Sequence, residues 1–169
     1  MPRSCIAAQM YTLREFTKTP DDIAKTLKRV RSIGYEAVQL SALGPIDTAE
    51  LKKILDGEGL AAVATHNSFR RMQEETQSLI DEHQLLGCKY LAIGSMPGEY
   101  RENAEGYEAF AKDAEAVAAK FAEAGLVFGY HNHSFELERF GNKTGLDIII
   151  QQTDSRLVTF ELDTYWIQH

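Results

Sequence analysis

The chain has 169 residues, of which 44% are hydrophobic and 25% are charged. That is enough polypeptide for one domain with a sizeable core, and the sequence is too apolar for a disordered tail. A complete eight-stranded β/α barrel takes about 250 residues, so the length argues against a complete barrel. We treat residues 1–169 as a single domain because no linker or low-complexity stretch divides them.

The charge balance excludes two classes of partner. There are 18 Lys+Arg against 25 Asp+Glu, which gives a net charge of −7. An acidic chain without a basic run is a poor match for nucleic acid or an anionic membrane, so we expect neither. Cys5 and Cys88 lie in apolar surroundings and are expected to be buried free thiols in a reducing compartment. With no signal peptide and no apolar stretch of ~18 residues, we expect a cytoplasmic protein.

Short apolar runs alternate with longer amphipathic segments along the chain. Runs of this length without polar alternation are typical of strands buried on both faces of a parallel sheet. The pattern predicts, in chain order, strand Cys5–Gln9, helix Asp21–Ser32, strand Ala37–Leu40, helix Thr48–Asp56, strand Leu60–Thr65, helix Phe69–Leu86, strand Tyr90–Ile93, helix Ala104–Glu123, strand Leu126–Tyr130, helix Gly145–Gln152 and strand Val158–Leu162.

Glycines mark the ends of most predicted helices. Gly34, Gly59, Gly87 and Gly125 each follow a helix and precede a strand, where a left-handed cap favours glycine. The repeat of strand, helix and glycine predicts parallel strands with right-handed crossovers. In such folds the chemistry lies at the carboxyl ends of the strands.

The predicted strand ends are polar. Gln9 and Gln39 end the first two strands, and His66-Asn67 follows the third. The fifth strand runs into His131-Asn132, in the same register as His66-Asn67. His83, in contrast, lies in a predicted helix among charged neighbours, and we expect it to be a solvated surface residue.

The densest polar cluster follows the fifth strand. His131 and His133 are two residues apart, so in extended backbone they project to the same side and are able to share a metal or move a proton. Glu136 adds an oxygen donor, and Asp163 ends a very apolar strand. An N-cap for the following segment is the alternative role for Asp163. Trp166 is interpreted either as a wall for a sugar ring or as rim packing.

Other catalytic signatures are absent from the sequence. There is no phosphate loop of the P-loop type, no dinucleotide fingerprint, no CxxC pair and no Gly-x-Ser-x-Gly elbow.

Taken in order, five motifs resemble the xylose-isomerase-like TIM-barrel family, whose members are described as sugar phosphate isomerases/epimerases. They cover the whole chain: Gln9–Arg14, Gly34–Leu40, Thr65–Ser68, Tyr130–Glu136 and Leu162–Trp166. The resemblance implies an α/β fold, a (β/α)8 TIM barrel truncated after about six strands.

The resemblance also implies a divalent metal ion, Mn, Mg, Co or Zn, at the carboxyl end of the barrel. Asp163 matches the ligand that the family places on its sixth strand. Glu136, the nearest acid to the fifth strand, is either a ligand or a substrate contact. His131 and His133 are then substrate contacts, proton-transfer groups or alternative ligands.

The implied reaction is isomerisation or epimerisation of a keto-sugar or cyclitol, by removal of the proton alpha to a carbonyl; if a hydroxyl leaves instead, the result is dehydration. A homo-oligomer is left open. The candidate residues are His131, His133 and Glu136 for catalysis, His66, Asn67, Gln39 and Trp166 for substrate binding, and Glu136 and Asp163 for the metal.

Three other functions are weighed against this one. The first is a metal-dependent hydrolase with His131 and His133 as zinc ligands, and the second is a non-catalytic sugar-binding or interaction module. The third, an abasic-site endonuclease, is disfavoured by the net charge of −7.

The length implies that the chain supplies six strands of an eight-stranded design, without a helix to cover the sixth. We therefore expect a truncated chain with unpaired sheet edges and half a metal site, which at this length aggregates or is inactive.

Overall fold

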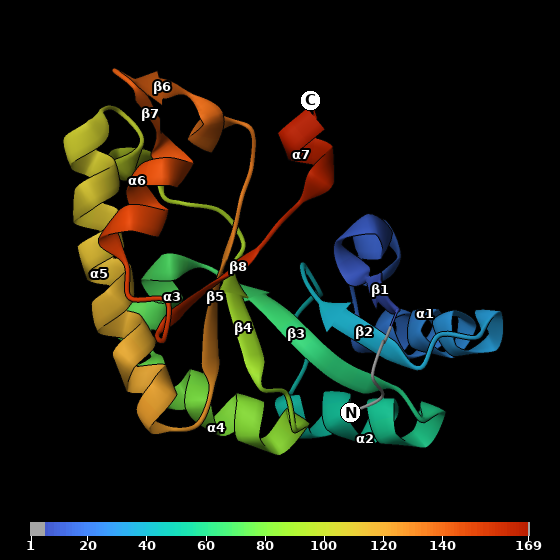
Figure 1. The fold of residues 1–169 in the computed structure, drawn as a ribbon. Coiled ribbons are helices and arrows are strands. Elements are labelled where there is room, and N and C mark those ends of the chain that lie inside the picture. Colours follow the sequence, from blue (N-terminus) through green and yellow to red (C-terminus); the bar gives the residue numbers. More distant parts are fainter. Residues whose placement is uncertain (1–5, 169) are drawn as a thin grey trace. The chain divides into compact units, whose positions relative to one another are not determined.

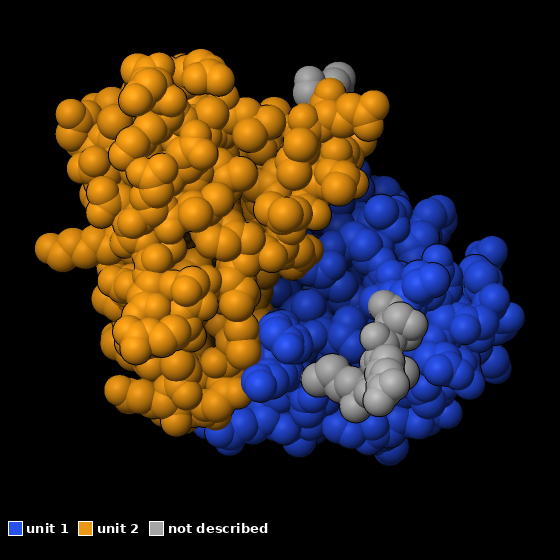
Figure 2. Space-filling model, in the orientation of Figure 1, with its two compact units in different colours: residues 1–66, 78–90 blue, residues 67–77, 91–169 orange. Residues whose placement is uncertain are grey.

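A computed structural model describes residues 6–168. Cys5 lies outside them, so its expected burial stays a prediction. The fold is α/β, as predicted, and the chain divides into two compact units, shown in separate colours in Figure 2. Unit 1 contains residues 6–66 and 78–90, and unit 2 contains residues 67–77 and 91–168. No helix within the described part of the chain is long and apolar enough to cross a membrane.

Unit 1 is built on three parallel strands in the order β1-β2-β3 (Figure 1). The strands are β1 (Ala7–Gln9), β2 (Ala37–Leu40) and β3 (Ala61–Asn67), whose last residue falls in unit 2. The helices are α1 (Pro20–Ile33), α2 (Thr48–Glu58) and most of α4 (Thr76–Leu86), and a 3-10 helix spans Met10–Phe16. Leu27 of α1, Val38 of β2 and Leu55 of α2 belong to one buried apolar cluster, which holds the helices on the sheet.

Unit 2 has its own set of strands in the order β4-β5-β8. These are β4 (Tyr90–Ile93), whose first residue falls in unit 1, β5 (Val127–His131) and β8 (Val158–Glu161), and β8 pairs parallel to β5. The helices are α3 (Phe69–Glu74), α5 (Ala104–Glu123), α6 (Gly145–Gln152) and α7 (Thr164–Gln168), and a short hairpin joins β6 (Arg139–Phe140) to β7 (Lys143–Thr144). Helix α6 packs against α5 (Figure 1).

The predicted elements are largely confirmed. Each predicted strand is present with ends within a residue or two, and α5 and α6 begin and end where predicted. The glycine caps are also confirmed, as Gly34 shows with a φ of 115° and an N–H bond to the Arg31 carbonyl. One expectation was wrong, because the predicted helix Phe69–Leu86 is broken into α3 and α4 at Glu75. A helix of five residues, α7, follows the sixth strand, but none of its residues is buried, so it does not cover that strand.

The expectation that His83 is a solvated surface residue was also wrong. Its side chain is only 2% exposed. Nδ1 lies 2.7 Å from the Leu79 carbonyl oxygen, and Nε2 lies 2.7 Å from Thr65 Oγ1 on β3. Since a carbonyl only accepts, Nδ1 carries the proton and Nε2 accepts from the Thr65 hydroxyl. The neighbouring Asp81 is exposed and Glu82 is half-buried, so charged neighbours in the sequence do not show whether His83 itself is buried.

The start of α6 allows a test of this packing. A Cβ on Gly145 would lie 2.3 Å from Cε1 of Tyr107, a fully buried ring on α5, whereas a Cβ on Gly34 would meet nothing within 4 Å. We expect Gly145→Ala to lower the free energy of unfolding by about 1–3 kcal/mol through overpacking. Gly34→Ala is the control and should cost about 1 kcal/mol, from backbone strain alone. Urea unfolding measures both, and a Gly145→Ala protein as stable as wild type would contradict this account.

Cys88 provides a second test. Its side chain is 1% exposed, and burial raises the pKa of the thiol to about 11. The reactive thiolate is therefore scarce at pH 8 and grows only as the pH rises towards that pKa. In a Cys5→Ser background, we expect labelling of Cys88 by a disulfide reagent at pH 8 to be slow in the native protein and fast in urea. Equal rates in the two conditions would show that the thiol is exposed.

Candidate active-site residues

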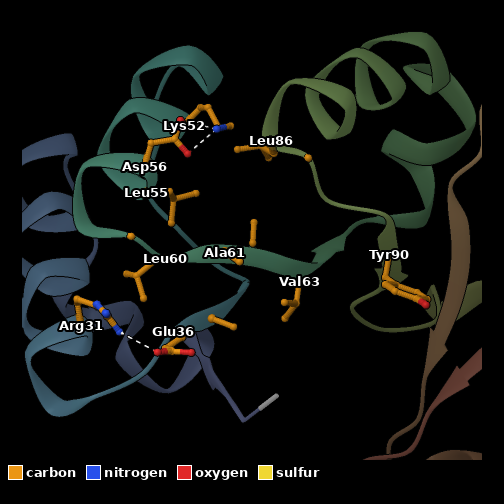
Figure 3. A pocket seen from close by; sticks show the side chains of 14 residues that line it. Arg31, Glu36, Lys52, Leu55, Asp56, Leu60, Ala61, Val63, Leu86 and Tyr90 are labelled. Atoms are coloured by element: carbon orange, nitrogen blue, oxygen red, sulfur yellow. Dashed lines mark hydrogen bonds and ion pairs between the residues drawn. The ribbon is translucent and has the colours of Figure 1, made fainter. Parts of the chain in front are cut away.

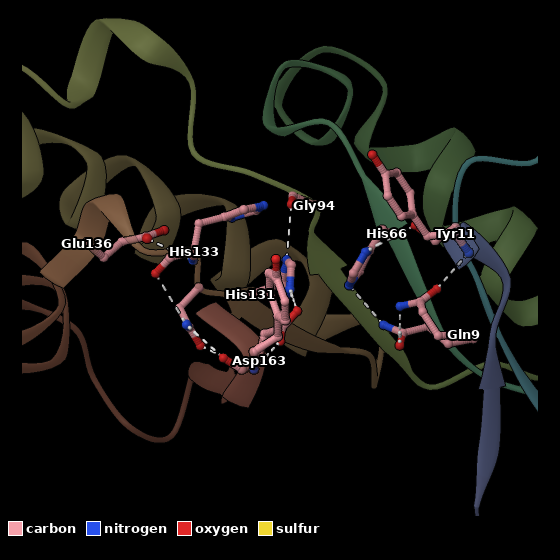
Figure 4. A network of polar contacts seen from close by, with 12 residues as sticks. Gln9, Tyr11, His66, Gly94, His131, His133, Glu136 and Asp163 are labelled. Carbon is pink, nitrogen blue, oxygen red and sulfur yellow. Dashed lines mark hydrogen bonds and ion pairs between the residues drawn. The ribbon is translucent and has the colours of Figure 1, made fainter. Parts of the chain in front are cut away.

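In unit 1, three side chains at the carboxyl ends of the strands form a chain of hydrogen bonds (Figure 4). Gln9 Nε2 donates to Gln39 Oε1 at 2.8 Å, and Gln39 Nε2 lies 2.9 Å from His66 Nε2. On the other side of the ring, His66 Nδ1 lies 3.2 Å from Ser41 Oγ. The Tyr11 backbone N–H donates to Gln9 Oε1 at 3.1 Å, which fixes the orientation of the first amide.

This chain of bonds determines the tautomer of His66. The amide nitrogen of Gln39 only donates, so His66 Nε2 must accept. The neutral ring then carries its proton on Nδ1 and donates it towards Ser41. Gln39 is therefore a partner of His66 and orients its ring.

In unit 2, His131 lies between two acceptors at the carboxyl ends of the strands (Figure 4). Its Nδ1 lies 3.1 Å from the Gly94 carbonyl oxygen, and its Nε2 lies 3.1 Å from Asp163 Oδ2. The register of β5 with β8 sets His131 opposite Glu161, so Asp163 follows two residues beyond the paired position. Because both neighbours accept, a proton on either ring nitrogen has a hydrogen-bond partner.

Asp163 has a second contact, to the backbone of α7. Its Oδ1 accepts the Tyr165 N–H at 3.0 Å, so the residue also caps that helix. Desolvation raises the pKa of Asp163, but the hydrogen bond from His131 and those from two backbone amides lower it by more, so the net pKa is below its usual value. The carboxylate is therefore held ionised, and 33% of its side chain is exposed.

Asn132 holds the two strand ends together. The side chain is completely buried, and its Oδ1 accepts the Asp163 N–H at 2.9 Å. An amide at this position thus fixes the backbone that presents Asp163 to His131.

Glu136 is a buried carboxylate with two donors of its own. Oε1 accepts the Tyr130 hydroxyl at 2.6 Å, and Oε2 accepts the backbone N–H of His133 at 2.8 Å. Its exposed fraction is 0%, and this desolvation raises its pKa although those hydrogen bonds and the charge of Arg101 oppose the rise. Glu136 therefore pins the loop that carries His133.

His133 lies among aromatic rings. It stacks on Phe135 with ring centroids 5.4 Å apart and planes at 12°. The ring centroid of Trp166 lies 5.1 Å from that of His133, and the centroid of His131 lies 4.8 Å from it in an edge-to-face arrangement. Aromatic faces of this kind are suited to packing against the apolar face of a sugar ring.

Comparison with known proteins decides the family. The sequence model that describes the xylose isomerase-like TIM barrel family matches residues 27–169. The chain belongs to this family. No curated protein is similar enough in sequence to count as a match.

Solved structures agree with a xylose isomerase-like TIM barrel fold. A sugar phosphate isomerase/epimerase from Parabacteroides distasonis aligns with a TM-score of 0.81 and 22% identity, over 99% of this chain and 69% of that one. A D-allulose 3-epimerase from Methylomonas sp. aligns with a TM-score of 0.71 and 18% identity, over 98% and 65%. A xylose isomerase-like protein from Mycobacterium smegmatis, in complex with magnesium, gives a TM-score of 0.68 and 14% identity over 94% and 64%. The chain thus has the fold of a xylose isomerase-like barrel over about two thirds of the length of these relatives.

The structure of this family member brings several of the predicted residues together. His131 contacts Asp163, the backbone of His133 contacts Glu136, and Gln39 contacts His66. Asn67 differs from its sequence counterpart Asn132, because its Oδ1 accepts from Arg71 Nη1 at 3.2 Å. The matching His-Asn pairs are therefore held by different partners.

Three residues at these clusters were missed by the sequence analysis. Ser41 forms a hydrogen bond with His66, Tyr130 donates one to Glu136, and Arg101 lies over the ring of Phe135. Tyr130 belongs to the motif Tyr130–Glu136, and the acid six residues after it was the available signal for it. Neither Ser41 nor Arg101 has a sequence signal, because each meets its partner only after folding.

The metal that the family implies can be compared with the donors present. Among residues 6–168, no three His, Cys, Asp or Glu side chains lie close enough together to hold an ion. Asp163 has the right chemistry and is partly exposed, whereas Glu136 is buried with both oxygens bonded to protein donors. The described residues do not themselves make up a metal site, so the metal roles of both stay predictions.

Unit 1 also has a groove away from these residues (Figure 3). Its volume is about 700 Å³, and it lies at the amino ends of β2 and β3, beside Ala37 and Ala61. The ion pairs Arg31–Glu36 and Lys52–Asp56 occur along it. None of the predicted site residues lines it, and the amino ends of barrel strands serve stability rather than chemistry.

The Tyr130–Glu136 contact yields a prediction for this barrel. Tyr130→Phe removes the hydroxyl that bonds the buried carboxylate and leaves one oxygen of Glu136 without that donor. We expect the free energy of unfolding to fall by about 1–3 kcal/mol at pH 7. Tyr90→Phe is the control, since that ring is 42% exposed and should change stability little. If urea unfolding gave equal stabilities for Tyr130→Phe and wild type, Glu136 would have to be satisfied in another way.

Proposed function

We propose that this chain carries part of the active site of an isomerase or epimerase that acts on a keto-sugar or cyclitol. The observation that supports it best is the His131–Asp163 pair, which joins the carboxyl ends of β5 and β8. Catalytic residues of β/α barrels occur at these ends. Structural neighbours named as isomerases and epimerases share the fold, which supports this class of reaction.

Proton transfer is the proposed task of this pair. Asp163 is ionised and partly exposed, so it is able to take the proton alpha to a substrate carbonyl. His131 orients the carboxylate through its 3.1 Å contact and accepts or returns the proton. His133 is the second candidate acid or base, since this residue is half-buried whereas His131 is buried.

Substrate binding is proposed for both units separately. In unit 2, Trp166 and His133 supply the aromatic wall against the sugar face. In unit 1, His66 and Gln39 supply fixed polar atoms. Asn67, the last residue of β3, is a further candidate polar contact and belongs to unit 2. A net charge of −7 favours a small sugar over nucleic acid or an anionic membrane as the partner. We propose a cytoplasmic setting for the protein.

A divalent cation, Mn, Mg, Co or Zn, belongs to the proposal with Asp163 as one ligand and Glu136 as a second candidate. The magnesium complex of the M. smegmatis protein supports a metal in a relative of the same fold. Such an ion would polarise the substrate carbonyl. When Asp163 holds the ion its carboxylate no longer serves as the base, and the proton step then falls to His131 or His133.

Proton exchange tests the function. With ketoses such as D-fructose and D-fructose 6-phosphate in D₂O, NMR should detect exchange of the hydrogen beside the carbonyl, with and without added Mn²⁺ or Mg²⁺. We expect Asp163→Asn to slow this exchange about a hundredfold or more, the contribution typical of a positioned acid or base. Glu123→Gln, an exposed carboxylate at the end of α5, is the matched control and should leave the rate unchanged.

The other outcomes separate the rival functions. Equal exchange in Asp163→Asn and wild type would overturn the assignment of Asp163. Sugar binding without exchange in the wild type would indicate a non-catalytic binding module. Hydrolysis of model esters or amides that depends on His131 and His133 would indicate the hydrolase.

A further inference from the structure

Arg101 lies in unit 2, in the connection between β4 and α5. Its Nε donates to the Met96 carbonyl at 2.9 Å, and its Nη2 donates to Ser95 Oγ at 3.0 Å and also contacts the Met96 carbonyl. Both acceptors follow β4, the strand whose end also supplies the Gly94 carbonyl to His131. The guanidinium is thus held by the same strand end that holds the candidate site.

An aromatic ring fixes the plane of this guanidinium. Arg101 Cζ lies 3.9 Å from the centroid of Phe135, a cation–π contact. Phe135 also stacks on His133, and His133 contacts Trp166. The positive charge therefore lies one ring away from the side chains that we propose to bind the sugar.

Arg101 differs from the other arginines in its charge partners. Within residues 6–168, carboxylates pair with Arg14, Arg31, Arg70, Arg71 and Arg156. Arg29 and Arg139 lack such a pair but are exposed to water, whereas Arg101 is partly buried. Arg101 is thus the one partly buried arginine of the described chain that has no carboxylate within 4.0 Å.

A partly buried cation held by neutral acceptors has lost water without gaining a counter-charge. The charge of Arg101 acts on Glu136, but that carboxylate is already bonded to Tyr130 and His133. Among the described residues, the Nη1 edge of Arg101 makes no hydrogen bond. A planar guanidinium with such an edge is suited to a carboxylate or phosphate group.

We propose that Arg101 binds an anionic oxygen group, phosphate or carboxylate, of the substrate and so selects acidic sugars over neutral ones. The sugar in this inference rests on the proposed function, whereas the anionic group rests on the geometry of Arg101 alone. The neighbours that share the fold differ in the same respect, since one is named for sugar phosphates and one for the sugar allulose.

Binding titrations test the proposal without requiring turnover. The chain has a single tryptophan, Trp166, so its fluorescence reports on this part of unit 2. The probes are D-fructose 6-phosphate, D-gluconate and uncharged D-fructose at constant ionic strength. Wild-type protein should bind at least one of the two anions more tightly than D-fructose, and the anion that gains identifies phosphate or carboxylate as the group recognised.

Variants test whether Arg101 causes the tighter binding of the preferred anion. We expect Arg101→Gln to weaken binding of the preferred anion about tenfold or more, the range for a hydrogen bond to a charged group, with D-fructose unaffected. Arg101→Lys should retain part of the affinity, because it keeps the charge and loses the planar fork. Arg139→Gln, which removes an exposed arginine of the same unit, should change nothing.

Several results would overturn the proposal. These are equal affinity for anionic and neutral probes in the wild type, an unchanged preference in Arg101→Gln, or an equal loss for D-fructose. The last would indicate a structural role beneath Phe135. None of these readouts measures proton exchange. A protein that binds anions through Arg101 but exchanges no proton would therefore disprove the isomerase function and leave the role of Arg101 intact.

Discussion

The parallel pairing of β5 with β8 is the constraint on which the candidate site of unit 2 depends. The register places His131 opposite Glu161, and the chain then needs only two more residues to bring Asp163 to the imidazole. Asn132 locks this arrangement by accepting the Asp163 N–H from a completely buried position. A shift of one residue in this pairing would turn the side chains to the other face and separate the two groups.

The loop after β5 is organised around a second constraint, the burial of Glu136. A carboxylate without access to water must be supplied with donors, and Tyr130 and the His133 amide provide them. The short 3-10 helix Phe135–Leu137 turns the chain so that Glu136 lies inside. The same turn places Phe135 where both His133 and Arg101 contact its ring. One buried acid thus arranges the aromatic and cationic groups around the candidate site.

Much of the fold could be predicted from local sequence. Thr19 caps α1 and Gly34 ends it, and both signals act within a few residues of the helix they bound. The break between α3 and α4 could not be predicted, because Met72, Leu79 and His83 continue one helical period across it. His83 was misjudged for a related reason. Its neighbours in sequence are charged, but its ring bonds Thr65, which lies on a strand.

The sequence by itself determined the α/β class, the strand order along the chain and the polar character of the strand ends. These depend on periodicity, caps and glycines, which act between near neighbours. Only the tertiary structure decided which polar groups meet: Asp163 with His131, Gln39 with His66, and Glu136 with Tyr130 inside the protein. The first two pairs join residues about thirty positions apart on different strands, and the third depends on which way a loop turns. Hydrogen-bond partners at such positions are set by strand register and burial, which no local pattern encodes.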